Sequence, residues 1–186
     1  MFRCCARSGR CRRLRRSRRK LVALGAANGS ETWNYGVPPA DCTIHSSADP
    51  TIADYDGDGT TDVLATTTEE VVVAFGARTG TEELRANLSD YGYTRPIVAD
   101  LTGDGAREIV VVDVQGKVFV LRPDGSTAWT RSFSLYTNAQ PAVADFDADG
   151  GPELAVGFVG SGNLSLLNGN GARQWTLGAP VSSSIT

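Results

Sequence analysis

The sequence predicts an all-β fold assembled from repeats of about 45 residues, each holding four short strands. Three observations predict it. An acidic loop recurs three times behind a proline, at Pro50, Pro96 and Pro141. Each loop is followed by an apolar run, a glycine turn and often a tryptophan. No segment shows a helical period of any length, and the 21 glycines are typical of a turn-rich chain.

The repeats carry two elements in a fixed order. The first element reads Pro50-Thr-Ile-Ala-Asp-Tyr-Asp-Gly-Asp-Gly-Thr-Thr-Asp-Val-Leu, Pro96-Ile-Val-Ala-Asp-Leu-Thr-Gly-Asp-Gly-Ala-Arg-Glu-Ile-Val and Pro141-Ala-Val-Ala-Asp-Phe-Asp-Ala-Asp-Gly-Gly-Pro-Glu-Leu-Ala. The second element runs from Val72 to Leu84, from Val118 to Trp129, from Leu164 to Trp175 and, before the first loop, from Leu21 to Trp33. At the other end, Pro180 to Thr186 resembles the lead-in to Pro50. The array at 21–186 therefore divides into three nearly whole units, 36–86, 87–131 and 132–176, with partial units at 21–35 and 177–186.

Each unit is predicted to form one blade of a β-propeller, a sheet of four short strands. Val63–Ala65 and Val71–Phe75 read as strands, and segments before the prolines, such as Tyr91–Thr94, read as weaker strands. A β-solenoid array is the alternative fold. A closed propeller needs roughly four to eight blades. The chain is therefore interpreted as part of a larger propeller or, less favoured, as half of one that a partner chain completes.

The charges are unevenly distributed. The first 20 residues hold 10 of the 18 Lys and Arg residues and no acid, so all 21 Asp and Glu residues lie in the rest of the chain. An acidic body excludes nucleic acid as the main partner, because phosphate binding requires a basic face. It is typical of secreted, cation-binding or salt-adapted proteins, and we expect an extracellular or cell-surface location. No apolar run approaches the roughly 18 residues of a membrane span, so no transmembrane segment is expected.

The basic N-terminal tip, residues 1–20, is predicted to lie outside the globular fold. The composition changes abruptly at Leu21, where the repeat begins in the middle of a unit. We therefore interpret the tip as foreign to the native structure, as a wrong start site or a shifted reading frame would make it. Ser17-Arg18-Arg19 beside Leu21 also resembles, faintly, a twin-arginine export signal.

The first acidic loop offers oxygen ligands at alternate positions. Positions 1, 3, 5, 7 and 9 are Asp54, Asp56, Asp58, Thr60 and Asp62, with the backbone carbonyl as the ligand at position 7. Hard oxygen ligands in this number suit Ca²⁺, whereas Mg²⁺ requires stricter octahedral geometry and more water. The β flanks and the absence of a Glu at position 12 exclude an EF-hand.

The other two loops repeat the pattern. Their candidate ligands are Asp100, Thr102, Asp104, Ala106 and Glu108, and Asp145, Asp147, Asp149, Gly151 and Glu153. Thr102 replaces a carboxylate by a hydroxyl, which predicts weaker binding at the second loop. The alternative is an acid-rich turn that only caps its own backbone. Three loops in register favour cation sites, because unpaired acids in one turn repel each other and a cation removes the repulsion.

At these residues the sequence resembles a known family. The acidic loop behind its Pro-x-x-Ala-Asp lead-in looks like the FG-GAP (VCBS-type) repeat of integrin alpha-subunit propellers and many microbial surface proteins. The element from Leu21 to Trp33 is similar to quinoprotein-type propeller repeats. The FG-GAP resemblance implies Ca²⁺ in loops at the blade rim, with a mostly structural role, at the residues named above. Thr102 and the Glu at position 9 of the second and third loops depart from the pattern, which affects the expected affinity but not the fold.

No catalytic constellation stands out. His45 is the only histidine, and no activated Ser or Cys forms a nucleophile–base pair. Trp33, Trp129 and Trp175 recur at one repeat position and are interpreted as blade-to-blade packing rather than as a stacking surface for a sugar or quinone. We expect a non-enzymatic calcium-binding module for protein or glycan binding or for structural support. The alternative is a fragment of a propeller enzyme, either a quinone-dependent dehydrogenase or a polysaccharide lyase.

Overall fold

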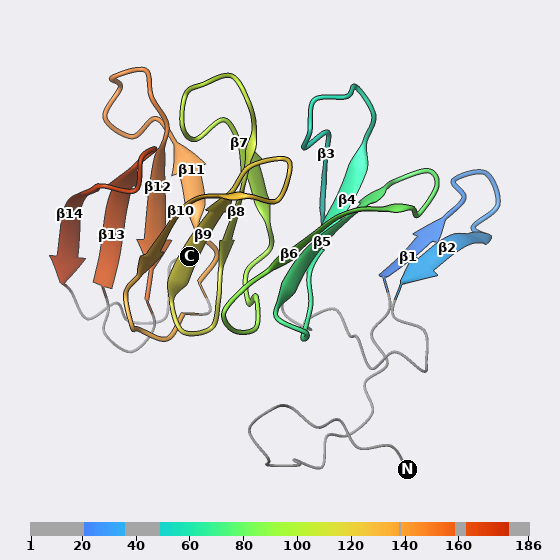
Figure 1. Ribbon diagram of the computed structural model, residues 1–186, viewed down its shortest axis with the longest axis horizontal. Coiled ribbons are helices and arrows are strands. Elements are labelled where there is room, and N and C mark those ends of the chain that lie inside the picture. Colours follow the sequence, from blue (N-terminus) through green and yellow to red (C-terminus); the bar gives the residue numbers. More distant parts are fainter. Residues whose placement is uncertain (1–20, 36–48, 138, 159–162, 179–186) are drawn as a thin grey trace, which may run out of the picture.

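The structure, a computed structural model, describes residues 21–35, 49–137, 139–158 and 163–178, and these residues form strands and turns without a helix (Figure 1). The first sheet is the hairpin of β1 (Leu21–Leu24) and β2 (Glu31–Tyr35). The second sheet holds β3 (Thr51–Ala53), β4 (Asp62–Thr66), β5 (Val71–Gly76) and β6 (Glu82–Asn87). The third holds β7 (Ile97–Ala99), β8 (Glu108–Val112), β9 (Lys117–Leu121) and β10 (Thr127–Ser132). The fourth holds β11 (Ala142–Ala144), β12 (Glu153–Gly157), β13 (Asn163–Asn168) and β14 (Arg173–Gly178).

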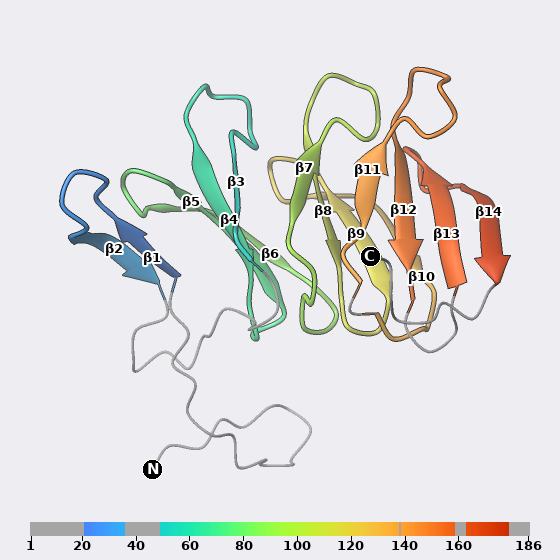
Figure 2. The ribbon, with the colours of Figure 1, turned by 180° about the vertical axis from the view of Figure 1, so that it is seen from behind.

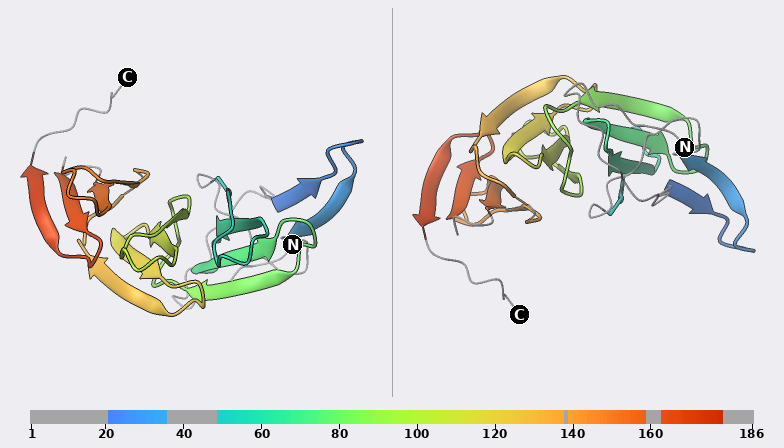
Figure 3. Two further views of the ribbon diagram at one scale, coloured as in Figure 1. Left: turned by 90° about the horizontal axis from the view of Figure 1, so that it is seen from above. Right: turned by 90° about the horizontal axis from the view of Figure 1, so that it is seen from below.

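Each four-stranded sheet is an antiparallel meander in sequence order. The sheets stand side by side along an open arc (Figures 2 and 3). The first strands β3, β7 and β11 lie on the concave side of this arc, and the fourth strands β6, β10 and β14 lie on the convex side (Figure 3). Four-stranded sheets arranged radially in this way are propeller blades. The predicted all-β, partial-propeller fold is therefore confirmed, rather than the solenoid alternative.

The hydrophobic core is divided among the spaces between neighbouring sheets. Leu64 and Ile109 are fully buried between the second and third sheets. Val110 and Leu154 belong to a second cluster, which joins the third and fourth sheets. Phe75 belongs to a third, which joins the β1–β2 hairpin to the second sheet. As in other repeat arrays, a sheet buries both of its faces only when a neighbour covers each of them.

The strands of the repeat are partly those predicted. The predictions at 63–65 and 71–75 are confirmed as parts of β4 and β5. The predicted weak strand at Tyr91–Thr94 is wrong, because this segment forms only an isolated bridge between Gly92 and Asp113. The first strand of the blade instead follows Pro96, as β7. Between the bridge and the strand, the Val112 N–H donates to the Thr94 hydroxyl at 3.0 Å and the Arg95 N–H donates to the Gln140 side chain at 2.9 Å, so the backbone ladder is interrupted.

Consecutive blades dock through a side chain of the fourth strand that covers a glycine turn on the next sheet. The Trp33 indole lies against Gly80, and its Nε1 donates a hydrogen bond of 2.9 Å to the Ala77 carbonyl. Trp129 lies in the same way against Gly171, and its Nε1 donates to a carbonyl of that turn at 2.7 Å. The interpretation of these two tryptophans as blade-to-blade contacts is confirmed.

Two of the units depart from this tryptophan contact at the same repeat position. Leu84 takes the place of the tryptophan between the second and third sheets, where it covers Gly125. Trp175 occupies the same repeat position in β14, but it is 42% exposed. Among the described residues no further sheet stands beyond β14, so the packing predicted for Trp175 has no partner within the array.

Several predictions fall outside the described residues. These are the basic tip at 1–20, the lead-in segment that contains His45, and the partial unit from residue 179 onward. Within the ranges that the structure describes, we find no helix of the length and hydropathy needed to cross a membrane.

Candidate metal sites in the blade loops

The three acidic loops connect the first and second strands of the three four-stranded blades. They cover residues 54–61, 100–107 and 145–152, and they rise from the same end of their sheets, uppermost in Figures 1 and 2. Gly57 and Gly59 take φ angles of 80° and 84°, a left-handed conformation that turns the first loop back on itself. In the third loop Ala148 stands in place of the first glycine with φ of 61°. Residues with a side chain rarely adopt this conformation, so the surrounding hydrogen bonds must hold it.

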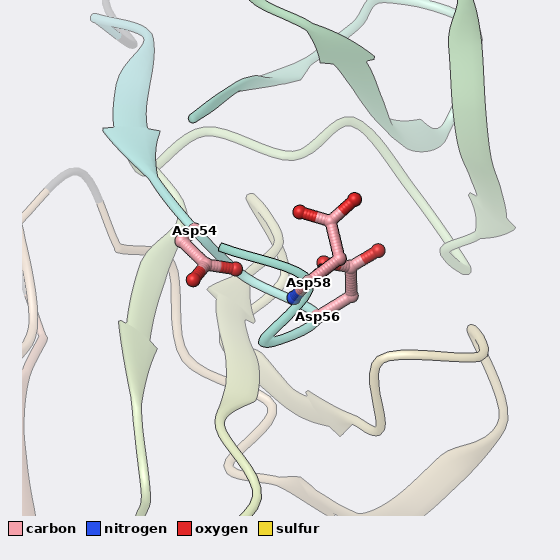
Figure 4. A group of neighbouring side chains, drawn as sticks. All are labelled: Asp54, Asp56 and Asp58. Carbon is pink, nitrogen blue, oxygen red and sulfur yellow. The ribbon is translucent and has the colours of Figure 1, made fainter. Parts of the chain in front are cut away.

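In the first loop three carboxylates converge. One oxygen of each of Asp54, Asp56 and Asp58 lies within 4.8 Å of the others (Figure 4). The Asp54 carboxylate is held in place by the backbone, because it accepts hydrogen bonds from the N–H groups of Gly57 at 2.8 Å and Gly59 at 3.2 Å. We call this group the first acidic trio. Because backbone N–H groups hold the Asp54 carboxylate, little further ordering of this side chain is required for binding.

The carboxylates of the first loop differ in electrostatics. Asp58 accepts two hydrogen bonds of 2.7 Å from the side-chain hydroxyl and N–H of Thr60, which lower the pKa of its carboxyl. Asp62 begins β4 and is 1% exposed, and this burial raises the pKa of its carboxyl. The Tyr55 N–H opposes the rise with a hydrogen bond of 3.4 Å, while the negative charges of Asp56 and Asp58 add to it. A cation at the trio would relieve this repulsion.

The third loop gathers a different set. Carboxylate oxygens of Asp145, Asp147 and Glu153 lie within 4.8 Å of one another, and we call them the second acidic trio. Glu153 begins β12, is 3% exposed and accepts a hydrogen bond of 2.8 Å from the Phe146 N–H. Asp147 accepts another, of 3.1 Å, from the Gln174 side chain of β14. The third loop therefore contributes its position 9, Glu153, to the second acidic trio, whereas the first loop contributes its position 5, Asp58, to the first acidic trio.

Position 5 of every loop turns toward its own backbone. The carboxylates of Asp58, Asp104 and Asp149 accept hydrogen bonds from the N–H groups of Thr60, Ala106 and Gly151, at 2.7, 2.8 and 2.8 Å. Asp58 nevertheless belongs to the first acidic trio. Among the described residues, Asp104 and Asp149 belong to neither trio. The predicted ligand set is therefore brought together only in part.

The second loop forms no trio of acids within the described part of the chain. Asp100 is held by backbone N–H groups as Asp54 is. The Thr102 hydroxyl donates to the Glu108 carboxylate at 2.9 Å, and the same carboxylate accepts the N–H groups of Leu101 at 2.9 Å and Thr102 at 3.0 Å. Glu108 is 1% exposed. Its oxygens are therefore occupied by the protein, and the Thr102 hydroxyl is turned inward.

Sequence reasoning missed a structural task of position 9. Asp62, Glu108 and Glu153 each begin the second strand of a blade and are at most 3% exposed. Each accepts the N–H of position 2 of its own loop. The two Glu residues reach it at 2.9 and 2.8 Å, whereas the shorter Asp62 reaches it only at 3.4 Å. The Glu at position 9, noted as a departure from the family pattern, was the available signal for this role.

A cationic side chain also reaches the first loop. Arg107, from the second loop, donates to the Asp54 carbonyl and lies 3.8 Å from the Asp54 carboxylate. A cavity of about 250 Å³ separates the two loops, lined by Asp54, Asp56, Gly57, Gly105, Ala106, Arg107 and Pro123. The ion pair is partly exposed, so it offsets only a small part of the repulsion in the trio. Nothing in the loop pattern had singled out Arg107.

Comparison with known proteins agrees with the repeat. A family model described as an FG-GAP-like repeat matches residues 54–111 and again residues 100–156, which together make up more than half of the chain. Both matches begin at position 1 of an acidic loop, at Asp54 and Asp100. A search of curated proteins gives no match.

Solved structures resemble the chain over most of its length. BamB from Moraxella catarrhalis is similar with a TM-score of 0.61 and 20% identity, over 85% of this chain and 43% of that chain. BBS1N, solved in complex with ARL6DN, is similar with a TM-score of 0.56 and 15% identity, over 81% of this chain and 45% of that chain. Quinohemoprotein alcohol dehydrogenase from Comamonas testosteroni is similar with a TM-score of 0.52 and 16% identity, over 72% of this chain and 21% of that chain. The chain spans less than half of each of these solved chains, and at these identities the likeness shows the fold alone.

Proposed function

This chain belongs to the FG-GAP-like repeat family, and from that premise we propose that it is a calcium-binding β-propeller module rather than an enzyme. Its place is outside the cell or on the cell surface, where it supports the binding of a protein or glycan or stabilises a larger propeller. The observation that carries the proposal is the pair of acidic trios, which form on equivalent loops of two blades.

The chemistry of the trios favours Ca²⁺. Both offer only carboxylate oxygens, which hard cations prefer, and two of the three acids in each trio are exposed, so water can supply further ligands toward the six to eight that Ca²⁺ takes. The raised pKa of Asp62 supports the first site, since it reflects burial together with the negative charge that a bound cation would offset. The second loop lacks a trio and is proposed as a weaker site. There the hydrogen bond from the Thr102 hydroxyl to the Glu108 carboxylate must break before Glu108 can bind an ion.

Calcium at these loops would stabilise the folded chain appreciably. Sites in extracellular modules bind with dissociation constants of about 10⁻⁴ to 10⁻³ M. At a free concentration 100 times the dissociation constant, one site adds about 2.7 kcal/mol to the free energy of unfolding. For a domain of this size that corresponds to a rise in melting temperature of about 5–11 °C per site.

Thermal melts in CaCl2 and in EDTA, together with calorimetric titration, test the proposal. Asp56→Asn and Asp147→Asn each remove one charge from a trio and keep an acceptor oxygen in place. Each is expected to remove about half of the calcium-induced rise in melting temperature, and the double variant nearly all of it. Glu69→Gln, an exposed acid outside both trios, is the charge-matched control and keeps the full rise. Equal melting temperatures in CaCl2 and EDTA for the unaltered chain would contradict calcium binding.

One structural neighbour supports a protein as the proposed ligand class. BBS1N was solved in complex with ARL6DN, so a chain with this fold does bind a protein. The likeness to quinohemoprotein alcohol dehydrogenase extends to the fold only and does not favour the enzyme alternative. Protease treatment of intact cells tests the location: a surface module is cut, whereas an internal one is protected.

A further inference from the structure

The two ends of the described array carry complementary surfaces. At one end, β14 exposes Trp175 at 42% and Leu177 at 58%, and we call these two residues the Trp175 face. At the other end, the β1–β2 hairpin exposes Val22 at 38% and Leu24 at 62%. These four side chains make up half of the large exposed hydrophobic residues in the described part of the chain. The contacts between neighbouring blades within the chain show what kind of surface packs against each of these two.

The first of these internal contacts lies between the β1–β2 hairpin and the second sheet. Trp33 covers Gly80, and Tyr35 stacks on Phe75 with ring centroids 4.7 Å apart. Val73 and Phe75, on β5, are 0% and 3% exposed as a result. The receiving surface thus consists of a glycine turn and two alternate apolar residues of the third strand.

The β1–β2 turn reproduces that receiving turn bond for bond. Gly25 N–H donates to the Ser30 carbonyl at 2.8 Å, and Gly29 N–H donates to the Gly25 carbonyl at 2.7 Å. In the receiving turn, the corresponding bonds from Gly76 and Gly80 measure 3.0 and 2.8 Å. Gly29 and Gly80 both have φ of 69°.

The difference between the two turns is that only one is covered. A Cβ placed on Gly80 would meet the Trp33 ring at 2.5 Å, whereas no atom of the described chain lies within 4 Å of a Cβ placed on Gly29. In the same alignment Val22 and Leu24 stand at the positions of Val73 and Phe75. We call Val22, Leu24 and the turn at 25–30 the hairpin face.

We propose that the Trp175 face of one chain binds the hairpin face of a second copy, head to tail. Trp175 then covers Gly29 as Trp33 covers Gly80, and its Nε1 donates to the Ala26 carbonyl as Trp33 donates to Ala77. Leu177, at the repeat position of Tyr35, packs on Leu24 at the repeat position of Phe75. The two faces lie at opposite ends of the described arc and do not meet within it (Figure 3).

The arc also sets the stoichiometry. The described arc holds three four-stranded sheets and one hairpin, and a propeller closes with roughly four to eight blades, so two arcs joined at both ends suffice for one ring. A head-to-tail contact that closes gives a finite cyclic assembly. We therefore assign a dimer with two identical, heterologous interfaces. This contact does not involve the acidic trios and is independent of calcium binding.

Sedimentation velocity of the purified chain between about 1 and 500 µM tests the proposal. A species of twice the 19.7 kDa chain mass is expected at the upper concentrations. Trp175→Ala and Leu24→Arg each damage one face, and each is expected to weaken association about 30-fold or more, as loss of a buried hot-spot residue does. Tyr136→Ala removes an exposed aromatic side chain that lies between β10 and β11, in neither of the two faces, and leaves the dimer intact.

An equimolar mixture of the two variants gives the sharpest result. Each variant retains the face that the other lacks, so the mixture regains association through one interface, while each variant alone remains monomeric. A mixture that stays monomeric overturns the head-to-tail arrangement, and an unaltered chain that is monomeric at 500 µM overturns self-association. Circular dichroism confirms that each variant folds, and Leu177→Glu replaces Trp175→Ala if that variant does not.

Discussion

Glu108 is expected to stabilise the fold by its hydrogen bonds alone. The change is Glu108→Ala. It removes the acceptor of three bonds, of which the Leu101 N–H keeps a second partner in the Ala99 carbonyl at 2.9 Å. The N–H and hydroxyl of Thr102 lose theirs. Two bonds to a charged group are worth about 1.5–3 kcal/mol each. Water partly replaces them at the exposed Thr102, so we expect a loss of about 2–4 kcal/mol.

Urea unfolding at neutral pH measures this loss. Glu108→Gln keeps one acceptor oxygen in place and is expected to lose only about 1 kcal/mol. The loss for Glu108→Ala should be the same in EDTA and at calcium concentrations too low to load the second loop, since the carboxylate then serves the backbone alone. The reasoning is refuted if Glu108→Ala unfolds within about 0.5 kcal/mol of the unaltered chain, as a surface change would.

Two further changes test the packing and the electrostatics. Trp129→Ala should lower the free energy of unfolding, measured in urea, by about 3–5 kcal/mol, as loss of a large packed aromatic side chain does. Trp129→Phe should lower it by less, since this variant loses chiefly the indole hydrogen bond. Equal losses for the two variants would contradict the contact with Gly171. Burial, followed by the charge of Asp56, raises the pKa of Tyr55 to about 12. The folded state resists ionisation of this phenol, so stability present below about pH 10 is lost as the pH rises toward 12. Tyr55→Phe should flatten the fall in melting temperature between about pH 9 and 11, and an unchanged slope would show that Tyr55 does not cause it.

The repeat itself was readable from the sequence because its signals are local. An acidic loop, an apolar run and a glycine turn recur in order, and each is defined by residues a few positions apart. The strands at 63–65 and 71–75 follow from such runs. The segment at Tyr91–Thr94 misled because its aromatic composition favours a strand, while the ladder forms after Pro96.

The geometry of the sites depended on contacts that the loop pattern does not contain. The first trio takes Asp58 at position 5 and the second takes Glu153 at position 9, whereas Glu108, which has the same length as Glu153, is held by Leu101 and Thr102 instead. Arg107 approaches Asp54 from a neighbouring blade, 53 residues along the chain. Trp175 matches Trp129 in the repeat, and only the neighbour that each one has in space distinguishes a buried contact from an exposed one.

A crystal structure of the chain grown in about 10 mM CaCl2, at a concentration above the expected dissociation constants, tests the central claim most directly. Anomalous scattering locates each ion without assumptions about its ligands. The account predicts one ion among Asp54, Asp56 and Asp58 and another among Asp145, Asp147 and Glu153, with lower occupancy or none at the second loop. Two empty trios, or calcium held only elsewhere, would contradict it.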